Sequence, residues 1–300
     1  MPEALCFIHA LTSVHAGAGQ GIDAIDLPIA RERATALPFI PGSSLKGCLR
    51  DRAQQNPDIS DADRRAIFGG EKPGANGEAA AGPAAGAISV GDAQLALFPV
   101  RSLAGTFVWA TSPFLLLRLR RDAQAAGLHG LPAIPQPAAG QAEMAHKMPL
   151  ILTNKLILEE YDLTANTSSP DAESWAAWLA GKLFPQSEDA DFRDALQQRL
   201  VILSDATLFS LARTATEIQA HIAMDKNTGT VQDGALWYQE SLPAETVLVS
   251  LLRAAPRKGR GLSGEEILNL LLPGDQTLQI GGKAGTGQGW VRIARAGGAA

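Results

Sequence analysis

Two aspartates stand three residues apart in the segment "GIDAIDLPIARER" (21–33), followed at once by a proline and two arginines. A carboxylate can accept a proton or hold a divalent cation such as Mg²⁺ or Mn²⁺, and arginine side chains bind phosphate groups. Asp23 and Asp26 are therefore candidates for metal-assisted chemistry on a phosphate ester. The residues alone leave a second interpretation open, in which the Asp26 side chain closes a turn ahead of Pro28.

Asp26 is the stronger candidate of the two aspartates. Pro28 restrains the backbone just after Asp26, and Asp23 has no such restraint beside it. We take Asp26 as the candidate catalytic residue and metal ligand, and Asp23 as either a solvated loop acid or a helper in holding the metal. His15 is a further possible helper, because an imidazole can donate to a phosphate or exchange a proton, although a lone histidine ending a strand more often has a structural role.

The segment "PGSSLKGCLR" (41–50) predicts a helix that begins after a proline–glycine turn, with a serine available as its cap. Lys46 and Arg50 lie one turn apart and share a face of this helix. A helix N-terminus also binds phosphate. We predict phosphate binding by Lys46 and Arg50, because the glycine-rich segments can fold beside them; a solvated face is the alternative. Arg31 is a similar candidate, unless it pairs with Glu32 or Asp26. The predicted phosphate-binding residues are Arg31, Ser43, Ser44, Lys46 and Arg50.

A glycine-rich segment near the C-terminus, "GGKAGTGQGW" (281–290), allows three interpretations. It can be a tight connection between antiparallel strands that needs positive φ angles, or a place where a polyanion backbone approaches closely. It can also be a nucleotide site, but it leads into a strand and lacks both the dinucleotide fingerprint and the Gly-Lys-Ser/Thr of a phosphate-binding loop. A nucleotide-binding enzyme remains a functional hypothesis, ranked third. The predicted polyanion-contacting residues are Gly281, Gly282, Lys283 and Gly285.

Composition narrows the class of protein. The 300 residues are 46% hydrophobic and 19% charged, with a formal net charge of −5, which argues against a surface coated in basic residues but allows a local basic groove. Cys6 and Cys48 are the only cysteines, and they show no zinc-ligand spacing. The sequence has neither the features of a signal peptide nor an apolar run that can span a membrane. We expect a cytoplasmic protein with no membrane partner.

Strand and helix patterns predict one α+β domain over residues 1–300. The order of these patterns indicates an antiparallel sheet with large insertions, because it lacks the regular alternation of a doubly wound sheet. Two segments rich in glycine, alanine and proline, 71–87 and 128–149, predict flexible loops. Residues 214–242 predict a β-hairpin with its turn at "NTG" (227–229).

Four segments follow one another along the chain: "LTSVHAGAGQGIDAIDLPIARERATALPFIPGSSLKGCLR", "SVGDAQLALFPVRSLAGTFVWATSPFLLLRLRRD", "TGTVQDGALWYQE" and "LQIGGKAGTGQGWV". In this order they resemble the RAMP proteins of type III CRISPR effector complexes. The run "IDLPIARE" followed by "PFIPGSSLKGCLR" is most similar to the repeated backbone subunit of the type III-B complex. The four segments are spread over residues 11–291 and lie outside the two predicted loops.

The resemblance implies a ferredoxin-like (RRM-like) core with large insertions, from which residues 214–242 project as a β-hairpin thumb. It implies an antiviral backbone subunit that binds guide crRNA, stacks head-to-tail on further copies of itself and contacts other subunits of the complex. It also implies metal-dependent endoribonuclease cleavage of complementary target RNA, with Mg²⁺ or Mn²⁺ as cofactor. The aspartate directly before "LPIARE", Asp26, is then the catalytic residue. A non-catalytic RNA-binding assembly subunit of the same fold is the first alternative.

Overall fold

The protein, as a computed structural model, is described over residues 1–21, 24–73, 79–145, 151–152, 155–226, 228–257, 261–274 and 276–297. Its longer helices are α1 (Gly42–Gln55), α3 (Pro113–Ala125) and α4 (Pro170–Leu183). Its shorter helices are α2 (Asp61–Phe68), α5 (Ala190–Arg199), α6 (Asp205–Thr214) and α7 (Gly264–Leu271). Helices and sheets are mixed along the chain, which confirms the α+β class. Within these ranges, no helix is both long enough and apolar enough to cross a membrane.

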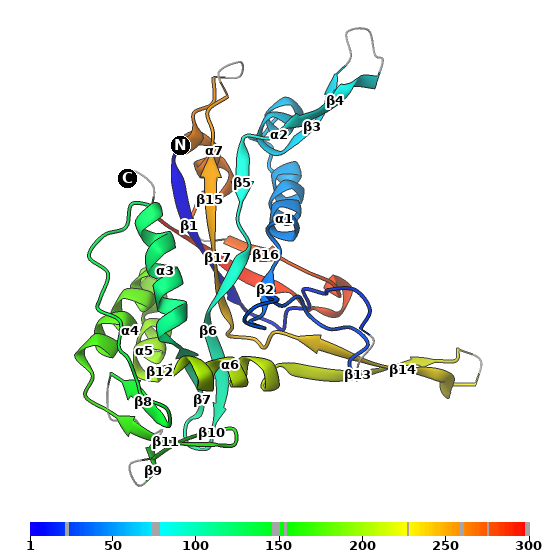
Figure 1. Cartoon of the computed structure of the whole chain (residues 1–300). Coiled ribbons are helices and arrows are strands. Elements are labelled where there is room, and N and C mark those ends of the chain that lie inside the picture. Colours follow the sequence, from blue (N-terminus) through cyan, green and yellow to red (C-terminus); the bar gives the residue numbers. More distant parts are fainter. Residues whose placement is uncertain are drawn as a thin grey trace.

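One large sheet runs through the body of the molecule (Figure 1). Its central strands are β17 (Trp290–Ala296), β1 (Glu3–Ala10), β15 (Val247–Ala254) and β6 (Ala93–Ser102), and each pairs antiparallel with the next. Strand β16 (Gln276–Gln279) pairs with β17, β5 (Ile88–Val90) with β15, and β2 (Phe39–Ile40) with β6. Apolar and β-branched residues dominate β1 and β15, as expected for buried strands.

The sheet continues beyond β6 into a second region, beside which α3, α4 and α5 lie (Figure 1). The strands that follow in order are β7 (Thr106–Thr111), β12 (Leu200–Leu203), β8 (Gln141–Met144), β11 (Tyr161–Asn166), β10 (Lys155–Leu158) and β9 (Ile151–Leu152). Strand β12 is parallel to β7, and β11 is parallel to β8. The sheet is therefore mixed in this region, whereas the sequence predicts an antiparallel sheet with large insertions.

Strand β1 is buried on both faces and separates two hydrophobic clusters. Cys6 and Ile8 belong to the cluster that includes buried residues of α1 and α7, whereas Leu5 and Phe7 pack with α3 and α4. Alternation of side chains along a strand sends neighbours to opposite faces, so both faces of β1 need a covering helix layer. Burial raises the pKa of the Cys6 thiol to about 12, which makes this cysteine a packing residue at neutral pH.

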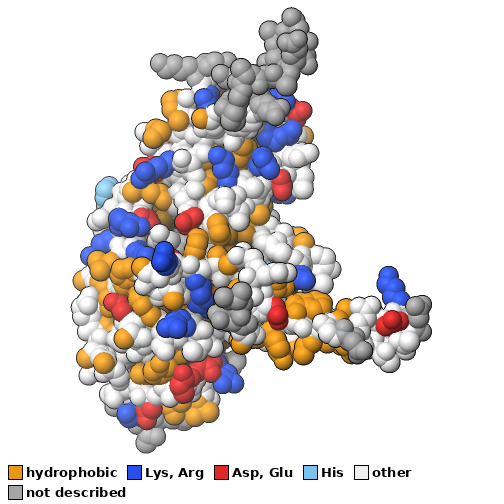
Figure 2. All heavy atoms as spheres, turned by 45° about the vertical axis from the view of Figure 1, so that its right-hand side comes forward, with side chains coloured by type: hydrophobic (Ala, Val, Ile, Leu, Met, Phe, Trp, Pro, Cys, Tyr) orange, Lys and Arg blue, Asp and Glu red, His pale blue; other side chains and the backbone are white. Residues whose placement is uncertain are grey.

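Strands β13 (Glu217–Met224) and β14 (Val231–Ser241) form an antiparallel hairpin that extends from the body as an arm (Figure 1). The hairpin lies where the sequence predicts one, and Asn227 of the predicted turn lies outside the described residues. Figure 2 shows hydrophobic side chains gathered along this arm. We call the exposed hydrophobic residues of its two strands the hairpin stripe: Ile218, Ile222, Met224, Val231, Leu236 and Tyr238.

Helix α1 begins at Gly42, two residues before the first position that a Ser43 cap would allow. Its N-cap is Pro41, and no side chain caps it. Ser43 and Ser44 lie exposed inside the first turn, so the predicted serine cap is wrong. The amide of Gly42 instead donates to Asp92 Oδ1 at 2.7 Å, and this long-range acceptor replaces the local cap.

Two segments predicted as flexible loops contain regular or packed structure. In the first, β3 (Gly69–Pro73) and β4 (Ala79–Ala85) pair antiparallel on either side of residues 74–78, which lie outside the described residues. In the second, the Trp175 indole donates to the carbonyl of Ala133 at 2.8 Å, and Leu128, Leu131 and Ile134 pack against a hydrophobic cluster. Backbone pairing and these few anchors give structure to segments whose composition alone predicts none.

Candidate functional site

Asp26 lies exposed at the base of the β13–β14 hairpin. Its Oδ2 accepts a hydrogen bond of 2.8 Å from the backbone amide of Tyr238. Leu27 continues this attachment as a parallel bridge: its amide donates to the Tyr238 carbonyl, and its carbonyl accepts from the Glu240 amide, both at 3.0 Å. Within the described residues Oδ1 of Asp26 has no hydrogen-bond partner, so this oxygen can bind a ligand. Asp23 lies outside the described residues.

His15 is buried against the same strand. Its Nδ1 donates to the carbonyl of Glu240 at 2.7 Å, which leaves Nε2 of the neutral ring as a proton acceptor. A Cβ at Gly17 would lie 2.8 Å from this Nε2, so any larger residue there would push against the ring. His15 and Asp26 are thus attached to backbone groups of β14 that are two residues apart.

Arg31 does not face solvent as a phosphate-binding cation would. Its Nη2 pairs with Oε1 of Glu240 at 2.5 Å, and its Nη1 donates to the carbonyls of Ala36 and Ala212 at 2.8 and 3.0 Å. The acid that pairs with Arg31 lies 209 residues away, and is neither of the two neighbouring acids that the sequence offers. Because the Arg31 guanidinium is already bonded to groups of the protein, these contacts argue against a phosphate-binding role for Arg31.

The glycine-rich segment connects the antiparallel strands β16 and β17. Gly281, Lys283 and Gly287 have φ angles of +87°, +64° and +80°, as the tight-connection interpretation requires. The amide of Gly282 donates to the carbonyl of His15 at 3.0 Å. The segment therefore lies next to the histidine of the candidate site, while most of its own residues are exposed.

The same segment packs on the face of β14 that carries Trp237 and Gln239. Gln239 Nε2 donates to Oε1 of Gln288 at 2.8 Å, and the ammonium of Lys283 lies 5.7 Å from the centroid of the Trp237 ring. Trp237 in turn stacks on His221 of β13. The structure thereby brings Lys283 to the opposite face of the strand from the Glu240 carboxylate.

Lys46 and Arg50 occupy a side of α1 that does not face the glycine-rich segment. Lys46 Nζ donates to the carbonyl of Ile88 in β5 at 3.2 Å, while Arg50 is exposed. Cys48 lies on the other side of the helix, where the Gly281 backbone hydrogen-bonds to its thiol. Burial and the nearby Asp51 charge raise the pKa of this thiol, and the hydrogen bond from Gly281 lowers it. The glycine-rich segment therefore does not fold beside the two cations of the helix.

The residues around Asp26 offer little to a metal ion before RNA binds. Across the described ranges there is no group of three or more His, Cys, Asp or Glu side chains that could hold a metal ion. Mg²⁺ is commonly bound through one or two carboxylates together with substrate phosphates and water. Oδ1 of Asp26 fits such a site as a single protein ligand, with the remaining positions left to RNA and water.

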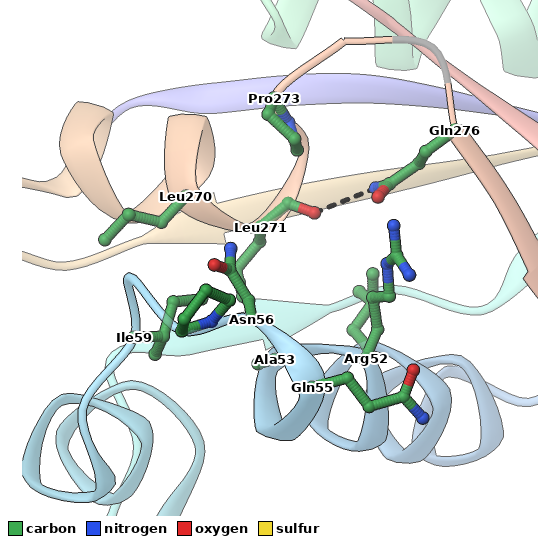
Figure 3. A pocket seen from close by; sticks show the side chains of 11 residues that line it. Arg52, Ala53, Gln55, Asn56, Ile59, Leu270, Leu271, Pro273 and Gln276 are labelled. Atoms are coloured by element: carbon green, nitrogen blue, oxygen red, sulfur yellow. Dashed lines mark hydrogen bonds between the residues drawn. The ribbon is translucent and has the colours of Figure 1, made fainter.

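A cavity of 280 Å³ lies elsewhere, where the end of α1 meets α7 and β16 (Figure 3). Arg52 and Gln276 border it, and Gln276 Nε2 donates to the Leu271 carbonyl at 2.9 Å. None of the candidate residues named above lines this cavity, so it is not part of the site.

Sequence reasoning missed the residues that join the site together. Glu240, Gln239 and Gln288 are all buried polar residues, and each bonds to a different segment of the chain. The sequence offers one local signal for two of them, since Gln239 and Glu240 directly follow the apolar run "ALWY" in the predicted hairpin. Burial of a polar side chain requires a partner, but the pattern does not say which one.

The RAMP superfamily model matches residues 7–292. The chain belongs to the RAMP superfamily. It is 32% identical over 299 residues to the "CRISPR system Cmr endoribonuclease Cmr4" of Pyrococcus furiosus, and the match covers 98% of this chain and 95% of that protein. The family expected from the sequence is thus confirmed.

Solved structures give the same result for the fold. The crystal structure of oligomeric Cmr4 from Pyrococcus furiosus matches with a TM-score of 0.75 and 27% identity, over 99% of this chain and 98% of the other. A chain of the type III-B Cmr-beta complex bound to cognate target RNA matches with a TM-score of 0.73 and 19% identity, over 98% and 97% of the two chains. The second match concerns the fold alone.

Proposed function

We propose that this protein is a guide (crRNA)-binding backbone subunit of a type III-B CRISPR antiviral complex and cleaves bound target RNA as an endoribonuclease within it. The similarity to an endoribonuclease of this complex type extends over nearly the whole chain. The observation that carries the cleavage role is the placement of Asp26, whose Oδ2 is held by the Tyr238 amide while the side chain stays exposed.

The chemistry follows from the groups at the base of the hairpin. RNA can be cut by attack of a ribose 2′-hydroxyl on the adjacent phosphorus: the hydroxyl gives up its proton, a 2′,3′-cyclic phosphate forms, and the P–O5′ bond breaks as the 5′-oxygen leaves and takes up a proton. This reaction needs a proton acceptor and stabilisation of the phosphate charge. Oδ1 of Asp26 and Nε2 of His15 are candidate proton acceptors, since each belongs to a side chain whose other polar atom bonds to the β14 backbone. A divalent cation, Mg²⁺ or Mn²⁺, bound at Asp26 would supply charge stabilisation at the phosphate. His15 is buried, so its proposed role is secondary.

Guide RNA would bind along exposed polar and cationic residues near this site. The exposed glycines of 281–285 let a phosphate backbone approach closely, and Lys283 contributes a charge beside Trp237. Exposed Ser43, Ser44 and Arg50 on α1 offer additional phosphate contacts. Lys46 is a weaker candidate than the sequence suggests, since its ammonium already bonds to a carbonyl.

Assembly with further copies of the chain and with other subunits of the complex is supported by the hairpin stripe. Its large apolar side chains are exposed on an arm that projects from the body (Figure 2), and large exposed apolar patches mark interaction surfaces. A structure of an oligomeric relative matches this chain over almost its full length. Head-to-tail stacking along a linear guide suits such an interface, because a heterologous contact that does not close produces an open assembly.

A ferredoxin-like core is the finer fold assignment that we propose. The order β17-β1-β15-β5/β6 is antiparallel throughout, α1 lies between β1 and β5 along the chain, and α7 lies between β15 and β17. This order corresponds to strands 4-1-3-2 of a βαββαβ unit. The second sheet region and the hairpin would then be insertions into that unit.

The deciding experiment uses the assembled complex with end-labelled target RNA, in Mg²⁺ or Mn²⁺ and in EDTA. Asp26→Asn keeps the shape of the side chain but binds a cation less well, so cutting should be abolished while assembly and guide binding persist. Wild type should cut at a regular spacing, one cut per stacked subunit, and Asp23→Asn should retain most of its rate. Full cutting by the Asp26 variant, or equal loss from both variants, would contradict the assignment.

One observation favours a second candidate, a non-catalytic assembly subunit of the same fold. Asp26 anchors the hairpin backbone through Tyr238, and this contact by itself is a structural role. The same cleavage assay distinguishes the two functions, because an assembly subunit binds guide and target yet leaves the target uncut in any metal.

A further inference from the structure

Glu240 is a carboxylate buried where three segments of the chain meet. It is only 3% exposed. Its Oε1 accepts hydrogen bonds from Arg31 Nη2 at 2.5 Å and from Thr216 Oγ1 at 2.8 Å, and its Oε2 accepts from the Ile29 amide at 3.1 Å. A buried carboxylate bonded in this way holds its donors in one arrangement, because any donor left unpaired is costly.

The backbone of Glu240 is engaged as well. Its amide donates to the Leu27 carbonyl, and its own carbonyl accepts from His15 Nδ1. In a regular parallel ladder the Glu240 carbonyl would accept the amide of Ile29. The carboxylate takes that amide instead, which leaves the carbonyl for His15. One residue therefore holds both the segment that carries Asp26 and the ring of His15.

We propose that Glu240 is a positioning residue for target cleavage. It keeps the Asp26 segment and the His15 ring in register with β14, and its burial prevents direct contact with RNA. The inference rests on the proposed catalytic role of Asp26. It goes beyond that role, because it makes cleavage depend on a side chain that touches neither substrate nor metal.

The test compares Glu240→Ala and Glu240→Gln with wild type in single-turnover target cleavage by the assembled complex. A misplaced reacting group lowers the rate constant, so we expect a loss of about 10- to 100-fold for Glu240→Ala. Glu240→Gln keeps only one of the two acceptor oxygens, which serve Ile29 on one side and Thr216 and Arg31 on the other. It also loses the charge opposite Arg31 but retains the bulk of the side chain, so it should show a smaller loss than Glu240→Ala. Affinity for target RNA should stay unchanged in both variants.

The matched control is Glu32→Gln. Glu32 belongs to the same loop and pairs with Arg118 through two hydrogen bonds of 2.7 and 2.9 Å, but it contacts neither β14 nor His15 in any described bond. Its loss should reduce the fraction of folded protein, and hence the cleaved amplitude, without changing the rate constant. A Glu240 variant with a reduced amplitude and a wild-type rate constant would show a purely structural role and overturn the proposal.

Two further measurements keep the proposal testable. Thr216→Val serves if Glu240→Ala does not fold. This variant removes one donor to the carboxylate and should still lower the rate constant. A wild-type rate constant in Thr216→Val counts against the proposal.

Hydrogen exchange on the unassembled chain should be faster at Leu27 and Ile29 in Glu240→Gln than in Glu32→Gln. A wild type that does not cut would overturn the proposed function, whereas a cutting wild type with an unaffected Glu240→Ala would overturn this inference alone.

Discussion

Gly281 lies so close to His15 that a Cβ on Gly281 would come within 2.4 Å of the His15 carbonyl oxygen. The φ angle of Gly281 is +87°, a value that side-chain-bearing residues rarely adopt. Two independent constraints therefore require glycine at this point, where the β16–β17 connection meets the segment after β1. The contact holds the exposed connection against the candidate site.

Gly281→Ala should lower the free energy of unfolding by about 1–3 kcal/mol, because it combines backbone strain with a clash against a backbone atom. It should also weaken guide RNA binding by displacing the connection. Gly285→Ala is the control, since nothing lies within 4 Å of a Cβ there. Chemical denaturation of both variants measures the difference, and equal stabilities would contradict the role assigned to Gly281.

Ile222→Asp should disrupt self-assembly on guide RNA. Ile222 is 49% exposed in the middle of the hairpin stripe, so a charge there costs little in the free protein but would be desolvated in an apolar contact. Leu117→Asp changes an equally exposed leucine of α3 (52%) and should leave assembly intact. Light scattering with guide RNA compares the two variants, and an elongated Ile222→Asp oligomer like that of wild type would exclude the stripe from the interface.

Lys283→Gln and Arg50→Gln should each weaken guide RNA binding and flatten its salt dependence, with a slope change of about 0.7 per lost contact to single-stranded RNA. Lys46→Gln should change the slope less, because Lys46 Nζ already donates to the Ile88 carbonyl. Arg101→Gln, at a 78% exposed side chain paired with Glu159, is the control. Filter binding across a salt series tests this order, and a steeper effect from Lys46 would reverse it.

Glu32 should make stability depend on acid pH. Burial by itself raises the Glu32 pKa, but hydrogen bonds from Arg118 and Thr35 together with the Arg118 charge bring the net pKa below its ordinary value. The unfolded state then binds the proton more readily, so this contribution is fully present above the ordinary glutamate pKa of about 4.3 and is lost as pH falls through the lower folded value. Melting curves of wild type and Glu32→Gln should therefore converge as the pH is lowered, and a gap that stays constant down to acid pH would contradict the pairing.

Local patterns of the sequence determined the elements near the site. Apolar runs at β1 and β15, the proline at the start of α3 and the glycines between β16 and β17 act over a few residues, so each can be recognised from its own segment. The hairpin at 214–242 follows from the same kind of local signal. The order of the motifs, with an aspartate before "LPIARE", was sufficient to identify the family.

Only the tertiary structure decided which partners the polar residues of the site take. Arg31 binds Glu240 across 209 residues, and Lys46 binds a carbonyl of β5, so two predicted phosphate contacts are engaged within the protein. The serine cap of α1 is replaced by Asp92 for the same reason. A charged side chain in a fold takes whichever partner packing places within reach, and packing depends on contacts between segments far apart in the chain. The sequence shows which groups are available, and the fold selects among them.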